Sequence, residues 1–196
     1  MSSYFRRCVQ RIKMKAAPTL YTERLILRPF TLEDAADVKR LTDDPDMAST
    51  TYEIEHPYKD GMAEELIQWY NQLYEKGEGL YFAITFRTDR TLIGAVGLKF
   101  RTHLPYKDAS LEYWIGKSYW NCGYCTEAAK VVVAYGFREY DIELIFAEHF
   151  KRNPASGRVM QKIGMHYSDF YPKDPEDDSS EDTIVYIIEK SEFEER

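Results

Sequence analysis

Apolar and polar residues follow two different spacings along this chain, and each spacing predicts one type of element. Alternating or continuous apolar runs of strand length, rich in β-branched and aromatic residues, predict β-strands. They occupy residues 24–30, 80–87, 92–100, 109–116, 143–150, 165–171 and 183–189. Apolar residues that recur three and four positions apart predict amphipathic helices. They occupy residues 31–41, 62–73, 124–140 and 153–164.

Helix start and stop signals support these boundaries. Thr31-Leu32-Glu33-Asp34 resembles a capping box at the start of the first helix. Asn153 and Pro154 form the typical cap and first position of the last helix, and Gly164 follows its end. Residues 43–57 contain two prolines and are predicted to form a loop. The resulting order is strand, two helices, three strands, helix, strand, helix and two strands, which predicts a mixed sheet with helices on its faces.

Length and composition indicate one domain. The chain has 196 residues, of which 44% are hydrophobic and 15% aromatic, enough for one substantial core and too few for two. We expect the domain to span residues 19–190, between an N-terminal extension at 1–18 that need not be ordered and an acidic tail at 191–196. No run of about 18 apolar residues occurs, and residues 1–15 contain no apolar signal-peptide core. The expectation is therefore a soluble, cytoplasmic protein without a membrane partner.

Charge is concentrated at the two ends of the chain. Residues 1–15 contain five basic residues and no acidic ones, whereas residues 173–196 contain ten acidic residues and three basic ones. Both segments can simply be solvated, and the acidic segment could also attract a cationic acceptor. In the second case, neutralising Asp177, Asp178 and Asp182 should raise the KM of the acceptor at low salt. The net charge of −7 disfavours nucleic-acid binding.

The sequence Trp120-Asn121-Cys122-Gly123-Tyr124-Cys125-Thr126-Glu127-Ala128 lies between a predicted strand and a predicted helix. A glycine-bearing turn at a helix N-terminus directs several backbone N–H groups at one point, as a diphosphate site requires. Cys122 and Cys125 also form a C-x-x-C pair, in which a helix N-terminus would lower a thiol pKa for redox chemistry. A zinc site is less favoured because no second C-x-x-C or paired His follows, and three cysteines are too few for a disulfide framework.

Three segments, taken together and in order, resemble the GNAT acetyltransferases, and more narrowly the RimJ/RimL-type branch that includes ribosomal-protein N-terminal acetyltransferases. They are Arg24-Leu25-Ile26-Leu27-Arg28-Pro29, residues 119–128, and residues 153–165. The resemblance covers about residues 19–190. It implies an α/β (α+β) fold with a mixed, mostly antiparallel sheet of about seven strands, splayed at a cofactor slot, and about four helices. It also implies transfer of an acetyl group from acetyl-coenzyme A to a primary amine.

The same resemblance assigns the cofactor site. The pyrophosphate loop of the family reads Q/R-x-x-G-x-G/A, and its three defined positions correspond to Trp120, Gly123 and Cys125. Aromatic Trp120 is familiar in this branch, but two residues depart. Asn121 stands where a second Gly is common, and Cys125 stands where Ala or Gly is common. Backbone N–H groups bind the diphosphate in this loop, so we expect binding to survive. The implied cofactor contacts are Trp114, Ile115 and Gly116 in the splayed strand, Trp120, Asn121, Cys122, Gly123, Tyr124, Cys125 and Thr126 in the loop, and Asn153 and Ser156 in the next helix.

An amine attacks only when it is deprotonated, so the reaction requires a base. Glu112 on the central strand is our candidate, acting directly or through water. In many relatives Gly occupies this position and the acid sits two residues earlier, where this chain has Ser110. Glu112 could therefore instead be a structural Glu, paired with a neighbouring Arg or Lys or hydrogen-bonded. Glu53, Glu55 and His56 lie in a loop that could also reach the acceptor.

A nearby hydroxyl can donate a hydrogen bond to the departing thiolate, and the resemblance assigns that role to Ser156. Asn153 is then expected to hydrogen-bond the pantetheine arm. Lys151, Arg152 and Arg158 could face the 3′-phosphate of coenzyme A or lie solvated on the surface. His103, His149 and His166 lie in or beside predicted strand ends, where a structural role is more common than a catalytic one.

Three classes of function remain open at this point. They are an acetyltransferase, an acyl-coenzyme A-binding sensor without turnover, and a C-x-x-C thiol-disulfide oxidoreductase. No metal is expected. The acceptor could be a protein N-terminus, a polyamine, an amino sugar or another small amine, because loop sequence does not encode ligand shape legibly. A homodimer is compatible with the resemblance.

Overall fold

The computed structural model of the chain describes residues 17–51, 54–101, 107–171 and 181–194. The predictions that concern Glu53, His103, most of the basic extension and most of the acidic loop, including Asp177 and Asp178, lie outside these residues.

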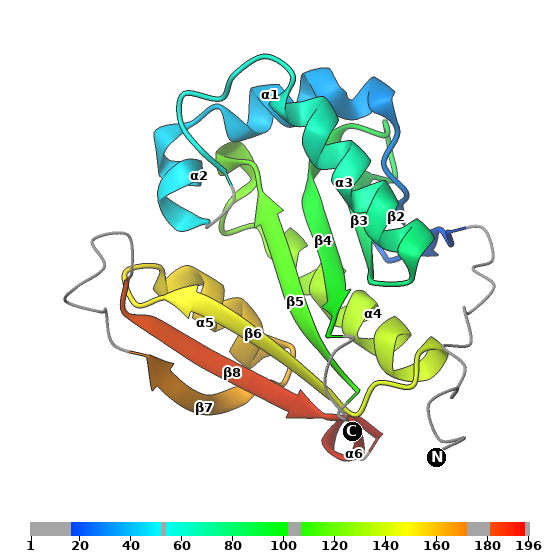
Figure 1. Cartoon of the computed structure of the whole chain (residues 1–196), viewed down its shortest axis with the longest axis vertical. Helices are drawn as coiled ribbons and strands as arrows, with labels where there is room; N and C mark the ends of the chain where they lie inside the picture. The colour runs from blue at the N-terminus through cyan, green and yellow to red at the C-terminus, as the bar shows by residue number, and fades with distance from the viewer. Residues whose placement is uncertain (1–16, 52–53, 102–106, 172–180, 195–196) are drawn as a thin grey trace, which may run out of the picture.

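One eight-stranded sheet runs through the molecule in the order β1-β2-β3-β4-β5-β6-β8-β7 (Figure 1). Its strands are β1 (Leu20–Tyr21), β2 (Leu25–Arg28), β3 (Gly79–Phe86), β4 (Leu92–Phe100), β5 (Asp108–Ile115), β6 (Leu144–Phe150), β7 (His166–Tyr171) and β8 (Thr183–Glu189). All neighbours pair antiparallel except β5 and β6, which pair parallel. The expected mixed, mostly antiparallel sheet is confirmed.

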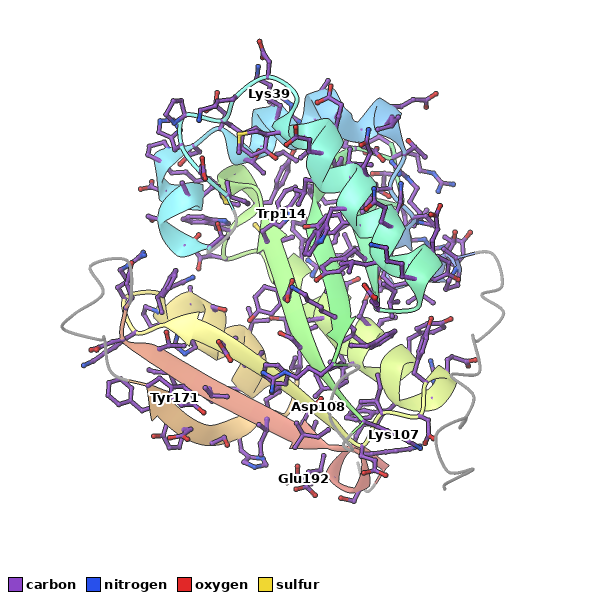
Figure 2. The ribbon with its side chains drawn as sticks, in the orientation of Figure 1. Lys39, Lys107, Asp108, Trp114, Tyr171 and Glu192 are labelled. Atoms are coloured by element: carbon purple, nitrogen blue, oxygen red, sulfur yellow. The ribbon has the colours of Figure 1, made fainter. Side chains whose placement is uncertain are left out.

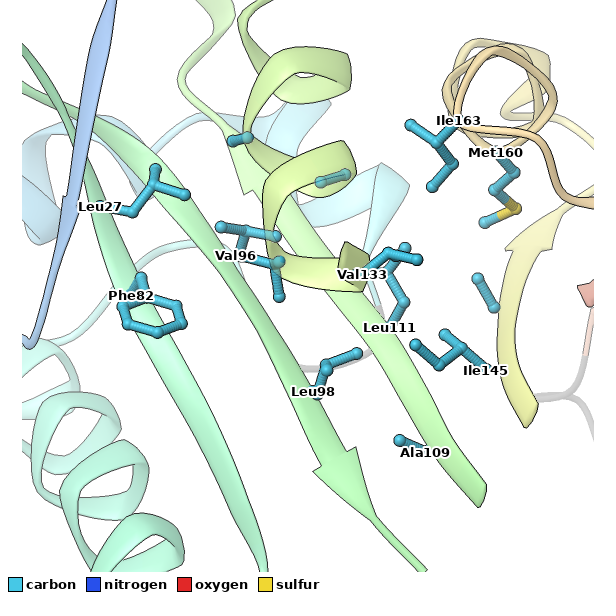
Figure 3. Close-up of a cluster of buried hydrophobic side chains, with 14 of the residues drawn as sticks. Leu27, Phe82, Val96, Leu98, Ala109, Leu111, Val133, Ile145, Met160 and Ile163 are labelled. Atoms are coloured by element: carbon cyan, nitrogen blue, oxygen red, sulfur yellow. The ribbon is translucent and has the colours of Figure 1, made fainter. Parts of the chain in front are cut away.

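Helices cover both faces of the sheet. They are α1 (Ala35–Thr42), α2 (Pro45–Thr50), α3 (Met62–Lys76), α4 (Tyr124–Glu139), α5 (Pro154–Lys162) and α6 (Lys190–Glu194), with short 3-10 turns η1 (Leu32–Asp34) and η2 (Lys117–Tyr119). Buried residues of α1 and α3 form one apolar cluster with Ala83, Ala95 and Trp114. Buried residues of α4 and α5 form a second cluster on the opposite face, which includes Leu98, Leu111 and Ile145 (Figure 3).

The predicted start signals of the first helical segment and of α5 are both formed in the structure. The Thr31 backbone N–H donates to Asp34 at 2.8 Å, as in a capping box, and Arg28 pairs with the same carboxylate at 2.6 Å. Asn153 caps α5 through its side chain, with Pro154 in the first turn. These local signals are readable because each uses residues within a few positions of one another.

Three short elements lie outside the predictions. The segment expected to be a loop contains α2, which Asp44 caps by accepting from the Asp46 N–H at 2.8 Å. Strand β1 has two residues and pairs with β2, and α6 forms at the start of the expected acidic tail. Phe193 of α6 packs on Phe137 of α4 with ring centroids 5.4 Å apart. Elements this short have too few residues to show a period, so tertiary contacts decide whether they form.

Strands β5 and β6 separate soon after they begin. Their pairing covers Asp108–Ser110 of β5 and Leu144–Phe146 of β6 and then stops. Figure 2 places Asp108 at the closed end of this divergence and Trp114 further along β5. After Ser110, no described strand pairs with the edge of β5 that faces β6. The predicted splay is therefore present, and beyond Ser110 this edge of β5 has no strand partner among the described residues.

Within the described residues, no helix is long and apolar enough to cross a membrane. The same residues contain no cluster of three His, Cys, Asp or Glu side chains placed to hold a metal ion.

Candidate functional site

A cleft of about 670 Å³ opens where β5 and β6 separate. Side chains from both faces of the sheet line it. Tyr81 and Glu112 belong to the α3 face, whereas Tyr113 and Ser156 lie on the face covered by α4 and α5. Because the cleft joins the two faces, one ligand can enter from each side and meet the other between the strands.

Glu112 lies on the α3 face of the cleft, where its carboxylate accepts a hydrogen bond of 2.5 Å from the Tyr81 hydroxyl. Gly97, which stands opposite both residues in the sheet, makes this contact possible. A Cβ at Gly97 would lie 2.3 Å from the Tyr81 ring, so only glycine lets the ring cross β4. Stacking on Tyr70 at 4.2 Å fixes the ring further. Glu112 is therefore both hydrogen-bonded, as the structural alternative held, and directed into the cleft.

Ser156 lies in the first turn of α5, on the other face of the cleft. Its Oγ is 2.9 Å from the Tyr113 hydroxyl of β5, which is also 3.0 Å from the Ser156 carbonyl oxygen. Asn153 caps the helix by accepting from the Ser156 N–H at 3.4 Å and donates to the Thr50 carbonyl at 3.5 Å. The Asn153 side chain thus forms hydrogen bonds within the protein, to the first turn of α5 and to Thr50.

The loop before α4 has a backbone arrangement of a kind that can bind an anion. Asn121 and Gly123 have positive φ angles of 61° and 80°, and α4 begins directly after them. Trp120 donates through Nε1 to the Ile115 carbonyl at 2.6 Å, which joins the loop to the end of β5. Around Gly123 the nearest atom to an added Cβ is on Arg24, at 3.5 Å, so the approach to the loop is open.

Arg24, between β1 and β2, supports this loop, a role that the resemblance did not give to its side chain. It donates to the Cys122 carbonyl at 3.1 Å and to the Glu127 carboxylate at 2.6 Å, and it covers the Tyr124 ring at 4.4 Å. Glu127 also accepts from the Thr22 hydroxyl at 2.5 Å. Burial raises the pKa of the Glu127 carboxyl, but the hydrogen bonds from Thr22 and Arg24 outweigh burial and hold that pKa below its usual range.

The two loop cysteines have different surroundings. Cys122 is exposed, whereas Cys125 packs against the core. Burial raises the pKa of the Cys125 thiol, the opposite of the lowering expected at a helix N-terminus. A thiol held protonated is a poor nucleophile, so the geometry disfavours thiol-disulfide exchange at this pair.

Of the other predicted contacts named below, Trp114 lines the cleft, whereas Ile115, Gly116 and Thr126 do not. Trp114 lines it and is buried against Tyr70, to whose hydroxyl its Nε1 donates at 3.4 Å. Ile115 and Gly116 are buried at the end of β5, and the Gly116 N–H donates to the Ile93 carbonyl at 2.9 Å. Thr126 is partly buried in the first turn of α4.

The basic residues near α5 have acidic partners. Lys151 pairs with Asp182 at 3.2 Å, and Arg152 donates to Glu181 at 2.5 Å, while Arg158 is exposed. Glu181 and Asp182, directly before β8, thus contact these two cations. Glu55 is exposed and His56 pairs with Asp43 at 3.3 Å, and neither lines the cleft.

Two of the candidate histidines have structural contacts. The ring of His149 is buried at the cleft, its Nδ1 is 2.8 Å from the Phe150 carbonyl, and it lies against Gly157 of α5. His166 of β7 lies 3.4 Å from Glu192 of α6.

Residues 24–166 match the acetyltransferase (GNAT) domain family. The chain belongs to the GNAT acetyltransferase family. A relative, the uncharacterized N-acetyltransferase YoaA of Bacillus subtilis (strain 168), is 31% identical over 147 residues, which cover 75% of this chain and 82% of that protein.

Solved structures show the same GNAT fold. The acetyltransferase (GNAT family) from Bacillus anthracis matches with a TM-score of 0.71 at 25% identity, over 89% of this chain and 99% of that one. RimL, a ribosomal L7/L12 α-N-protein acetyltransferase in complex with coenzyme A, matches with a TM-score of 0.77 over 88% of this chain and 98% of that one. Its identity is 13%, so this likeness shows the fold alone.

Proposed function

We propose that this GNAT protein transfers an acetyl group from acetyl-coenzyme A to a primary amine by direct attack in a ternary complex. We further propose that it belongs to the RimJ/RimL-type branch. The observation that carries the proposal is the cleft between β5 and β6, which joins the two faces of the sheet and has Glu112 on one side and Ser156 on the other.

The residues on the α4 side fit acetyl-coenzyme A. Backbone N–H groups at the Asn121–Gly123 turn and the N-terminus of α4 would hold the diphosphate, because an anion there meets aligned dipoles and an open approach. The edge of β5 after Ser110 would pair with the pantetheine arm. When bound, acetyl-coenzyme A supplies the acetyl group as a thioester. Asn153 would contribute by fixing α5, because its side chain already caps that helix.

Glu112 would serve as the base on the acceptor side. A carboxylate is a weak base for an ammonium group, so it needs either close contact with the amine or a bridging water. Tyr81 would hold the carboxylate in one orientation through the 2.5 Å hydrogen bond. Ser156, across the cleft, would donate a hydrogen bond to the departing sulfur.

The acceptor would enter from the α3 face. Aromatic and aliphatic side chains of α3 and β6 line that part of the cleft, together with the carboxylates of Glu112 and Glu148, and the cations of Lys99 and Arg101 also line the cleft. The two carboxylates would bind a cationic amine. Small-molecule amines and protein N-termini both meet this requirement, and RimL, which shares the fold, is an acetyltransferase of a ribosomal protein.

The test is thiol release from acetyl-coenzyme A across amines and N-terminal peptides, with thermal shift by coenzyme A measured alongside. Amine-dependent release identifies the transferase and its acceptor class. A thermal shift without release on any acceptor would favour a coenzyme A-binding sensor. Neither shift nor release, with disulfide exchange at Cys122, would overturn the proposal.

The role of Glu112 has a separate test. Glu112→Gln should lower kcat/KM and change the shape of its pH dependence, because the variant has no carboxylate to accept the proton of the amine. Glu143→Gln, an exposed change at the start of β6, is the matched control and should leave the profile unchanged. If Glu112→Gln leaves the pH profile intact, another group accepts the proton.

A further inference from the structure

Two hydroxyl groups meet on the coenzyme A side of the cleft, and the proposed reaction requires only one of them. The Tyr113 hydroxyl is 2.9 Å from Ser156 Oγ and 3.0 Å from the Ser156 carbonyl oxygen. Tyr113 comes from β5 and Ser156 from α5, so this contact connects the part of β5 beyond its pairing with β6 to α5. Both residues line the cleft.

The protonation state of Tyr113 fixes what it can do. Burial raises the pKa of its phenol well above the usual range, with Cys125 as the second cause. The phenol therefore keeps its proton at any working pH and has one hydrogen to donate. Burial also keeps Cys125 protonated, so the titratable group from α4 beside the pair is neutral. His149, from β6, is the other titratable residue at this wall of the cleft.

The single hydrogen of Tyr113 has two acceptors within reach, and the choice decides where the Ser156 hydrogen points. If the phenol donates to the Ser156 carbonyl, the serine hydroxyl can donate back to the phenol oxygen, and no hydrogen faces the cleft. If the phenol donates to Ser156 Oγ, the serine hydrogen must point elsewhere, and the cleft is the open direction. A hydroxyl that accepts one hydrogen bond is also a better donor of the next.

We propose that Tyr113 is a positioning residue that donates to Ser156 Oγ and so directs the serine hydrogen at the sulfur of coenzyme A. This inference rests on the proposed function and adds a residue to which the resemblance gave no role. The pair acts as a chain of two hydrogen bonds, from phenol to serine and from serine to sulfur, and the first orients and strengthens the second.

The chemical step balances without a proton leaving either hydroxyl. The carbon–sulfur bond of the tetrahedral intermediate breaks, and its electron pair goes to the sulfur. Coenzyme A thiol resembles a Cys thiol, with a pKa of about 8.5, so it can leave as the thiolate, and serine, a far weaker acid, keeps its proton. Ser156 stabilises the thiolate by a charge-assisted hydrogen bond, and the sulfur takes a proton from solvent after release.

The first experiment needs no acceptor. The thiol of bound coenzyme A is titrated by its thiolate absorbance, with the desulfo analogue as the blank, in wild type, Tyr113→Phe, Ser156→Ala and the double variant. One charge-assisted hydrogen bond corresponds to about one pH unit, so we expect Ser156→Ala to raise the thiol pKa by about that amount. Tyr113→Phe should raise it by about half as much, and the double variant should match Ser156→Ala.

The second experiment is a kinetic cycle on the same four proteins. We expect Ser156→Ala to lower kcat by about 10- to 100-fold and Tyr113→Phe by about 3- to 10-fold, with the KM of acetyl-coenzyme A unchanged. In the Ser156→Ala background, Tyr113→Phe should have no further effect. Tyr135→Phe, a partly buried tyrosine of α4 that does not line the cleft, is the control and should leave kcat unchanged. Thermal unfolding of each variant reports its folding.

Each outcome has one meaning. Coenzyme A binding with the same thiol pKa in wild type and Tyr113→Phe would overturn the role of Tyr113 and leave the proposed function intact. Multiplicative effects of the two substitutions on kcat would do the same, because a residue that only packs acts independently of Ser156. Absence of coenzyme A binding by the wild type would contradict the proposed function and, with it, this inference.

Discussion

Glu127 connects the N-terminal strands to the helix that would hold the diphosphate, and its removal should weaken both stability and cofactor binding. Its carboxylate accepts from the Thr22 hydroxyl at 2.5 Å, the Arg24 N–H at 2.9 Å and Arg24 Nε at 2.6 Å. In Glu127→Gln the charge disappears, and the amide can accept through one oxygen only. Arg24 then loses its ion pair while it still contacts the Cys122 carbonyl.

The size of the expected stability loss depends on how exposed the two side chains are. The Glu127 side chain is 18% exposed and that of Arg24 is 43% exposed, so solvent screens part of the pair. Hydrogen bonds to charged groups contribute about 1.5–3 kcal/mol when shielded, and we expect about 1–2 kcal/mol here. For a chain of this size, such a loss lowers Tm by about 2–8 °C.

The direction of the Glu127 pKa shift determines how this stabilisation changes with pH. Because the folded-state pKa of Glu127 is depressed, its stabilisation is present above the unfolded pKa of about 4.3 and is lost as pH falls through the folded value. The Tm difference between wild type and Glu127→Gln should therefore be full at pH 7 and shrink below about pH 4. Glu139→Gln, an exposed change on the same helix, is the control. Equal Tm values at pH 7, or a difference that persists at low pH, would refute this reasoning.

The affinity for coenzyme A should fall in parallel, and calorimetric titration of Glu127→Gln would measure it. Gly97→Ala should lower stability by about 1–3 kcal/mol in chemical denaturation, since its Cβ would lie 2.3 Å from the Tyr81 ring and 2.6 Å from the Leu80 carbonyl; a loss below about 0.5 kcal/mol would be inconsistent with the site geometry. Gly157→Ala would place a Cβ 2.6 Å from His149 Nε2. It should raise the activation free energy of turnover by more than it lowers the free energy of unfolding, and unchanged turnover would argue against a fixed α5. Cys122→Ser should leave thiol release from acetyl-coenzyme A intact. If this variant no longer released thiol, the redox interpretation would again be favoured.

The elements that can be predicted from the sequence are those whose signals are local. The repeats of apolar residues over 62–73 and 124–140 correspond to α3 and α4, and the runs at 80–87 and 92–100 correspond to β3 and β4. The prediction of a loop throughout 43–57 is wrong where α2 forms, even though Asp44 and Pro45 are a helix start signal. Six residues are too few for an apolar period to be visible, so α2 could not be separated from a turn.

The candidate site was predictable in its residue types and less so in their partners. Glu112 and Ser156 both line the cleft. Tyr81 is 31 residues from Glu112, and Tyr113 is 43 residues from Ser156, so only strand register and helix placement bring these pairs together. Arg24 is 103 residues from Glu127, and no local pattern marks it. Such pairings depend on tertiary structure, which a single sequence does not display.

The cleft between β5 and β6 is where we propose that an amine and acetyl-coenzyme A meet. Initial rates of thiol release, measured while both concentrations are varied, test this most directly, with the acetylated amine identified by mass spectrometry. We predict amine-dependent release with intersecting double-reciprocal lines, as a ternary complex requires. Parallel lines would indicate an acetylated enzyme instead, and release that does not depend on any amine would contradict the proposal.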